Sequence, residues 1–169
     1  IRDRFSPDTE LGRWLATRNT MLRIGRNLFV HAGLSARLLE RNLEMDTLNA
    51  RMSEGLYRTS KERREDPTLE FLYRSAGPVW YRGMVCTDEK YDPLTPEQTD
   101  ALLRRYDADR LLVGHTIFPD ISTFHDGRVI AVNVQNELNR RKNRGRAVLI
   151  EGSRISVVGN RGVKRVLEE

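Results

Sequence analysis

Residues 110–120 read RLLVGHTIFPD, and this stretch joins a short apolar run to a glycine, a histidine and a threonine. Arg110 to Val113 have the length and composition of a buried strand. His115 then stands directly beyond the end of that strand, and the whole chain contains only three histidines. Because ligands of layered α/β proteins gather at the carboxyl ends of strands, His115 is a candidate site residue.

A second histidine has the same kind of setting. Residues 27–35 read NLFVHAGLS, so His31 also follows a short apolar run and precedes small residues. Small neighbours let a ligand approach the backbone, and imidazole is a common ligand of transition metals. The matching contexts favour one shared site for His31 and His115, with two hydrogen-bonded core histidines as the alternative. His125 lies beside an Asp-Gly turn signal, and we expect it on the surface.

The helical part of the pattern lies mainly before residue 107. Ser6, followed by a proline, is typical of a helix start, and the apolar face of the helix that would follow is formed by Leu11, Trp14, Leu15, Met21 and Leu22. Residues 35–58 also read as helical. The charged stretch 59–67 reads as a solvated loop or helix end. Thr95 and Gln98 have the spacing of a capping box, which predicts a helix that ends near Tyr106.

The C-terminal half is rich in predicted strands. Besides the strand at 110–113, residues 123–134 and 146–159 each read as a hairpin around a turn that contains glycine. Helices followed by several strands indicate a mixed α/β fold.

Composition limits the classes of function. The 169 residues suffice for one sizeable domain, and no apolar run of about 18 residues predicts a transmembrane helix. One cysteine, Cys86, excludes an internal disulfide and leaves the compartment open, with the cytoplasm slightly favoured. Arginine supplies 25 of the 29 cationic residues, which reflects either a general surface preference or an anionic ligand. We do not expect nucleic-acid binding, because no aromatic residues alternate with the basic ones.

Four motifs, taken together, resemble a known family. NLFVHAGLS and LLVGHT resemble the two later histidine motifs of the calcineurin-like metallophosphoesterase superfamily. GPVWYRGM, residues 77–84, is similar to a segment of the bacterial-type serine/threonine protein phosphatases called Shewanella-like phosphatases. FHDGRVIAVNV, residues 124–134, resembles the strand pair that follows in the same family. The resemblance runs from about Asn27 to Val158.

The resemblance implies a fold and a reaction. The fold would be the C-terminal portion of a four-layer α/β/β/α sandwich with a mixed sheet, with residues 1–169 forming one incomplete domain and residues 35–75 a possible helical cap. The reaction would be metal-dependent hydrolysis of a phosphoester, foremost by a serine/threonine protein phosphatase that uses metal-activated water. The family's cofactors are two divalent metal ions, for which manganese, iron or zinc would be suitable.

The resemblance also assigns roles to single residues. His31 and His115 match two ligands of one metal ion. Arg82 matches an arginine that holds the phosphate oxygens, for which a planar guanidinium is well suited. Tyr81 is a candidate substrate contact, with ordinary aromatic packing as the alternative, and Trp80 is expected in the core.

The family's earlier motifs, which carry an Asp-x-His pair, a Gly-Asp-x-x-Asp-Arg segment and a Gly-Asn-His segment, do not occur in this chain. The chain also begins with Ile1. We therefore expect a C-terminal half that is inactive alone and whose partner is the N-terminal half of the same enzyme, as a separate or cleaved chain. The other expected partner is a phosphorylated substrate, foremost a phosphoprotein, and no membrane partner is expected. The alternatives are a nucleoside-polyphosphate hydrolase of the same superfamily and a non-catalytic module that binds or regulates phosphoproteins.

Overall fold

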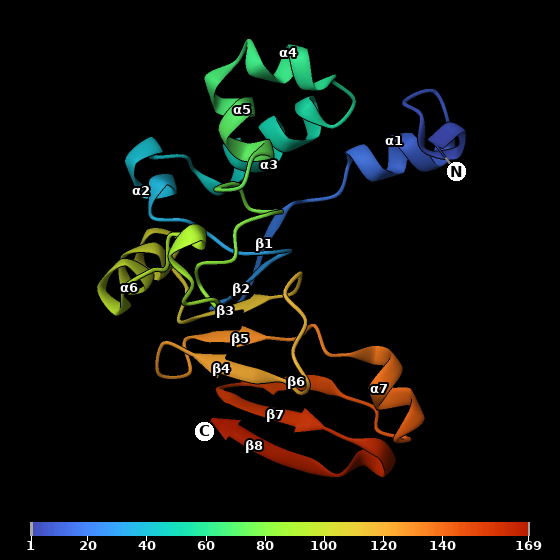
Figure 1. Ribbon diagram of the computed structural model, residues 1–169, viewed down its shortest axis with the longest axis vertical. Helices are drawn as coiled ribbons and strands as arrows, with labels where there is room; N and C mark the ends of the chain where they lie inside the picture. The colour runs from blue at the N-terminus through green and yellow to red at the C-terminus, as the bar shows by residue number, and fades with distance from the viewer. Residues whose placement is uncertain (1, 169) are drawn as a thin grey trace.

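The computed structural model describes residues 2–168, which form a helical layer and two β-sheets (Figure 1). The helices are α1 (Glu10–Ala16), α2 (Arg37–Arg41), α3 (Met45–Gly55), α4 (Ser60–Arg64), α5 (Pro67–Tyr73), α6 (Pro96–Arg105) and α7 (Asn136–Arg141). The strands are β1 (Met21–Ile24), β2 (Asn27–Val30), β3 (Arg110–Val113), β4 (Ser122–Phe124), β5 (Val129–Ala131), β6 (Ala147–Glu151), β7 (Arg154–Val158) and β8 (Lys164–Glu168). Short 3₁₀ turns span Arg2–Phe5, Glu89–Tyr91 and Asn160–Gly162.

The larger sheet is mixed, and its strands lie in the order β1-β2-β3-β5-β4. The pairs β2–β3 and β3–β5 are parallel, whereas the pairs at the two edges are antiparallel. Val30 lies opposite Val113, so β2 and β3 end at the same level. The α/β class and the mixed sheet predicted from the sequence are confirmed. The smaller sheet, β6-β7-β8, is antiparallel throughout.

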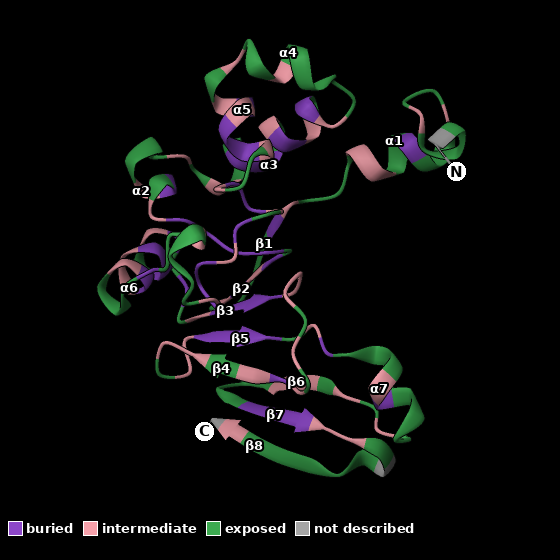
Figure 2. Cartoon of the chain, viewed as in Figure 1, coloured by how far each residue is buried: buried purple, intermediate pink, exposed green. Residues whose placement is uncertain are grey.

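The larger sheet separates two clusters of buried side chains, because successive residues of a strand point to opposite faces. On β3, Leu111 and Val113 belong to the cluster shared with the helices, whereas Leu112 belongs to the cluster shared with the smaller sheet. Figure 2 shows β3 and β5 buried along their length, as expected for central strands. The cluster between the sheets is formed by Leu112, Ile121, Ile130, Val134, Ile155 and Val157. The described residues thus form three layers, one helical and two of sheet.

Several local predictions are confirmed. The strands predicted to begin at Asn27 and Arg110 form as β2 and β3. Both predicted C-terminal hairpins form, as β4–β5 and β6–β7. Helix α6 begins with the predicted capping box: the Thr95 side chain accepts from the Gln98 amide at 3.2 Å, and the Gln98 side chain accepts from the Thr95 amide at 2.9 Å. Tyr106 is the C-cap of this helix.

The first predicted helix begins at another residue than expected, and the apolar face predicted for it does not form. Helix α1 is capped by Thr9 rather than Ser6, and Trp14 is 54% exposed. The apolar residues that follow belong to β1, which pairs with β2 in a hairpin. Gly25, at φ 57°, supplies the left-handed residue of its tight turn, a signal that the helical reading of these residues overlooked.

The helix predicted over residues 35–58 is interrupted. Asn42, at φ 47°, ends α2 in a left-handed conformation, and α3 begins three residues later. The stretch predicted as solvated contains α4, which starts with a capping box between Thr59 and Glu62. Helices α2 to α5 lie together beside the sheet, and Leu48 and Leu72 reach the main core (Figure 1). That residues 35–75 act as a cap stays a prediction. No helix within residues 2–168 is long and apolar enough to cross a membrane.

Candidate functional site

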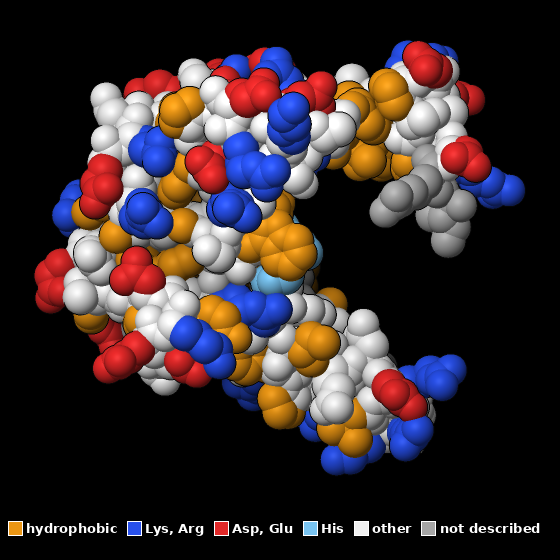
Figure 3. All heavy atoms as spheres, turned by 45° about the horizontal axis from the view of Figure 1, so that its top comes forward, with side chains coloured by type: hydrophobic (Ala, Val, Ile, Leu, Met, Phe, Trp, Pro, Cys, Tyr) orange, Lys and Arg blue, Asp and Glu red, His pale blue; other side chains and the backbone are white. Residues whose placement is uncertain are grey.

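His31 and His115 meet at the carboxyl ends of β2 and β3. His31 Nε2 lies 3.2 Å from His115 Nδ1, and the two rings are edge-on with centroids 5.1 Å apart. The backbone amide of Gly114 donates to the His31 carbonyl at 2.8 Å and fixes the two strand ends relative to each other. In Figure 3 pale-blue histidine atoms lie at the inner wall of a large hollow, between orange hydrophobic and blue cationic side chains.

In the turn after β3, the residue with the unusual backbone conformation is His115. His115 has φ 57°, in the left-handed region that residues with a side chain adopt at a cost on the order of 1 kcal/mol. The sequence suggests Gly114 for this role, but that glycine serves a close approach instead, since a Cβ there would lie 3.2 Å from the His31 carbonyl oxygen. Backbone strain of this kind is often found at functional sites.

One nitrogen of the histidine pair has no protein partner. His115 Nε2 is buried, and no residue in the described part of the chain offers it a hydrogen bond. Burial, then the positive charge of Arg82 and the neighbouring His31, lower the pKa of His115 below its usual value. The imidazole of His115 is therefore neutral at pH 7. A buried polar atom without a partner calls for a ligand or a chemical role.

The third member of the site is Arg82. Its guanidinium donates to Thr116 Oγ1 at 3.2 Å and lies 5.9 Å from the ring centre of Tyr91. No carboxylate among the described side chains forms an ion pair with it. The loop that carries Arg82 is anchored to the end of β2, because the Ala32 amide donates to the Pro78 carbonyl at 2.9 Å. The fold thus holds a half-buried cation beside the imidazole pair.

The aromatic residues before Arg82 behave differently from each other. Tyr81 is 3% exposed and donates its hydroxyl to the Asp92 carbonyl, and burial raises the pKa of this phenol. Its contact with substrate stays a prediction. Trp80 is 56% exposed, so its expected place in the core is wrong. Its ring stands edge-on to His115 at 5.6 Å, which makes it part of the site wall.

The sequence predicts His125 at the surface, but in the structure both of its ring nitrogens contact other residues. It is half-buried, and its Nδ1 lies 3.2 Å from Thr99 Oγ1 on α6. Its Nε2 lies 3.1 Å from the Met84 carbonyl oxygen. Although the adjacent turn is at the surface, the His125 ring points inward and ties α6 to the loop that carries Arg82.

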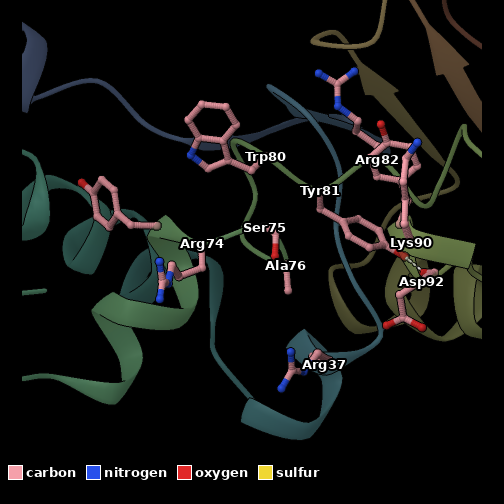
Figure 4. A pocket seen from close by; sticks show the side chains of 11 residues that line it. Arg37, Arg74, Ser75, Ala76, Trp80, Tyr81, Arg82, Lys90 and Asp92 are labelled. Atoms are coloured by element: carbon pink, nitrogen blue, oxygen red, sulfur yellow. Dashed lines mark hydrogen bonds between the residues drawn. The ribbon is translucent and has the colours of Figure 1, made fainter. Parts of the chain in front are cut away.

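Two cavities adjoin this site. One, of about 680 Å³, lies on the Arg82 side and is drawn in Figure 4. The other, of about 740 Å³, is a largely apolar groove beside His31. Of the residues that line the first cavity, the sequence had indicated Arg82 and Tyr81 for the site and Trp80 for the core, but not Arg37 or Arg74. Thr116 was noted only as the threonine of the GHT motif.

The depressed pKa of His115 gives a direct prediction. In the folded protein its imidazole should titrate below 6.5, and Arg82→Gln should raise this pKa because it removes a nearby positive charge. Since the unfolded chain then binds more protons, the free energy of unfolding should fall as the pH drops below 6.5. NMR titration of the imidazole signals and urea unfolding between pH 8 and pH 5 measure both effects.

His115→Asn is the matched variant for that measurement, because asparagine tolerates the left-handed backbone and does not titrate. It should show a weaker loss of stability with falling pH. A His115 pKa at or above 6.5 in the wild-type protein would contradict the prediction.

Three solved structures are similar to this chain along almost its whole length. A cold-active protein tyrosine phosphatase solved at 1.1 Å has 29% sequence identity and a TM-score of 0.86, covering 98% of this chain and 46% of the other. A point mutant of such a phosphatase has 28% identity and a TM-score of 0.86, with coverage of 97% and 47%. The cold-active protein-tyrosine phosphatase of a psychrophilic Shewanella species has 28% identity and a TM-score of 0.85, with coverage of 96% and 46%.

The chain therefore spans about half the length of these solved structures. No protein-family profile matches the chain, and no curated protein matches it.

These findings correct the resemblance drawn from the sequence. The similar structures are described as protein tyrosine phosphatases, so the assignment to calcineurin-like metallophosphoesterases of the serine/threonine type is wrong. Within residues 2–168 no group of three or more histidine, cysteine, aspartate or glutamate side chains could hold a metal ion. His31 and His115 contact each other, and no carboxylate among the described side chains completes a group of three with them. The prediction of two divalent metal ions is therefore wrong, and the comparisons do not support the inactivity that was expected from missing metal ligands.

Proposed function

We propose that this chain carries the phosphate-binding site of a phosphatase that hydrolyses phosphate monoesters of tyrosine. The observation that carries the proposal is Arg82, a half-buried cation without a carboxylate partner in the described chain, held beside two imidazoles at strand ends. The similarity to protein tyrosine phosphatases over 96–98% of this chain supports the same reaction class.

In this proposal the guanidinium of Arg82 binds two oxygens of the phosphoryl group. A planar fork of donors fits a tetrahedral anion, and the fixed positive charge stabilises the charge that develops on the equatorial oxygens in the transition state. Thr116 Oγ1 keeps the guanidinium in place by accepting one of its hydrogen bonds. The other N–H groups of Arg82 remain for the substrate.

The imidazole pair serves as the acid-base group. Water attacks phosphorus, the bond from phosphorus to the ester oxygen breaks, and the products are inorganic phosphate and a phenol. The water loses a proton and the leaving oxygen gains one, which are steps that a neutral imidazole near pH 7 performs. Because His31 Nε2 and His115 Nδ1 lie within hydrogen-bond distance, a proton accepted by one ring can pass to the other.

The aromatic surroundings favour tyrosine over serine as the phosphorylated residue. Trp80 is exposed beside His115, and the ring centre of Tyr91 lies 5.9 Å from the Arg82 guanidinium. Two aromatic rings near a phosphate-binding cation offer contact area to a phenyl ring that a serine side chain lacks.

Phosphate release from a matched set of substrates tests the proposal. The set contains a phosphotyrosine peptide, the same peptide with phosphoserine, p-nitrophenyl phosphate and a dinucleoside polyphosphate. We expect the highest kcat/KM with the phosphotyrosine peptide. A preference for the polyphosphate would instead show a nucleotide hydrolase, and peptide binding without phosphate release would show a non-catalytic binding module. Either result would overturn the proposal.

The polypeptide partner expected from the sequence stays a prediction. The described surface offers such a partner the apolar groove beside His31. Leu22 and Val132 of this groove are 44% and 38% exposed, and Ile24 on the same edge strand is 59% exposed. An edge strand with exposed apolar side chains is a common place for further chain to pack.

A further inference from the structure

We propose that the cavity on the Arg82 side is a second anion subsite, which takes an acidic side chain of the peptide next to the phosphorylated residue. This inference rests on the proposed function for the identity of the phosphorylated residue. It concerns a different part of the surface, formed by the beginning of α2, the end of α5 and the loop that runs from Trp80 to Asp92.

The cavity is continuous with the candidate site through two residues. Arg82 and Trp80 line it, and both also approach His115, Trp80 by a ring contact and Arg82 by its charge. Figure 4 shows Arg37 and Arg74 on the opposite side of the cavity from Arg82. A peptide whose phosphoryl group contacts Arg82 would therefore place a neighbouring side chain toward Arg37 and Arg74. A volume of about 680 Å³ suits a short segment of peptide.

The charges of the lining favour an anion. Four cationic side chains and one carboxylate line the cavity: Arg37, Arg74, Arg82, Lys90 and Asp92. A concave wall with one predominant sign of charge concentrates the field and raises the local concentration of ligands of the opposite sign.

The ion pairs show which cations remain for a ligand. Lys90 pairs with Asp88 at 2.8 Å, and Arg74 lies 3.6 Å from Glu70 in an exposed pair of little strength. Arg37 is exposed and forms no ion pair with any residue of the part of the chain described. The acidic side chain would therefore bind Arg37, with Arg74 as the second contact.

The other walls fit a peptide. Tyr73, Trp80, Tyr81 and Tyr91 line the cavity between the cations, and their rings offer apolar contact to a peptide backbone and its β-carbons. Asp92 is the one carboxylate of this lining, so the cations outnumber it. The cations line a single concave pocket rather than a continuous basic track, which favours an acidic peptide over a nucleic acid strand.

The test compares peptides that differ in one side chain. A phosphotyrosine peptide with a glutamate at each neighbouring position in turn is compared with its alanine counterpart, first by fluorescence anisotropy and then by phosphate release. For the wild-type chain we expect glutamate at one position to strengthen binding about three- to fivefold, the strength of an ion pair at a partly exposed site. The advantage should shrink between about 0.05 M and about 0.5 M salt, because exposed charges are screened.

The variants Arg37→Gln and Arg74→Gln locate the effect. In Arg37→Gln the ratio of the two peptide affinities should fall to about one, and in Arg74→Gln it should fall in part. Arg140→Gln, on the exposed last turn of α7, is the matched control and should keep the wild-type ratio. Equal binding of the glutamate and alanine peptides by the wild type, or a ratio unchanged in Arg37→Gln, would overturn the subsite.

The same peptides without phosphate separate this inference from the proposed function. If the glutamate peptide still binds more tightly than its alanine counterpart, and Arg37→Gln removes the difference, the subsite stands even where no phosphate is released. If phosphate is released at equal rates from both phosphopeptides, the proposed function stands and the subsite is wrong. Tighter binding of a single-stranded oligonucleotide than of the acidic peptide would also overturn the assignment to a peptide.

Discussion

Arg82→Gln is expected to lower kcat/KM for the phosphotyrosine peptide by about a hundredfold, the loss typical of a donor that stabilises transition-state charge. Glutamine keeps much of the side-chain length but removes the charge and the fork of N–H groups that faces the phosphoryl oxygens. Because Arg82 has no carboxylate partner among residues 2–168, its removal leaves no unpaired anion behind. The expected loss therefore lies in the reaction rather than in the fold.

Two further variants distinguish charge from geometry. Arg82→Lys keeps the positive charge but offers a point charge in place of the planar fork, so its activity should lie between those of the wild type and Arg82→Gln. Arg140→Gln removes an arginine on α7, a helix that supplies no residue of the proposed site, and should leave kcat/KM unchanged. Urea unfolding of each variant shows whether the fold is retained. An Arg82→Gln enzyme within about twofold of the wild type would contradict the phosphate-binding role.

Leu111→Ala is expected to lower the free energy of unfolding by about 3 to 5 kcal/mol. Leu111 is 0% exposed on the central strand β3, and it faces the cluster that joins the helices to the larger sheet. Truncation removes buried methyl groups and leaves a cavity, because β2 and β5 hold β3 from both sides and limit its collapse. Urea unfolding followed by circular dichroism measures the loss.

Leu11→Ala is the matched control for the same change of side chain. Leu11 is 46% exposed on α1, and alanine is a good helix former, so the free energy of unfolding should change by less than about 0.5 kcal/mol. Similar losses of unfolding free energy for Leu111→Ala and Leu11→Ala would contradict the expectation that the burial of β3 stabilises the fold.

The histidine pair could be predicted from the sequence because its signal is local. A short apolar run followed by histidine and small residues marks the end of a strand, and parallel pairing of two such strands brings their ends together. The structure places His31 and His115 in contact, as the matching contexts indicated. The role of the pair could not be predicted from this local signal, because two imidazoles are compatible with a metal site and also with an acid-base pair. The acid-base role is our proposal, and the described residues offer no group of three or more histidine, cysteine or carboxylate side chains for a metal ion.

Other features of the site depend on tertiary structure. Arg37 and Arg74 come from different helical segments, and no spacing in the sequence relates them to the loop that carries Arg82. Trp80 was expected in the core because large aromatic residues usually are, yet this one lies on the surface beside His115. In the fold, the hairpin that turns at Gly25 places Met21 and Leu22 in β1, although their spacing from Leu11 had indicated a helix.

The parallel pairing of β2 with β3 also determines when the site can exist. His31 and His115 are 84 residues apart, and closing so long a loop costs entropy that local contacts cannot repay. Helices α2 to α6 lie inside this loop, and we expect them to form first because helical contacts are short in sequence. On a ribosome, His31 emerges before β3, and the pair can form only after β3 has been synthesised. The chain therefore acquires its candidate active site late in folding, after most of its helices are in place.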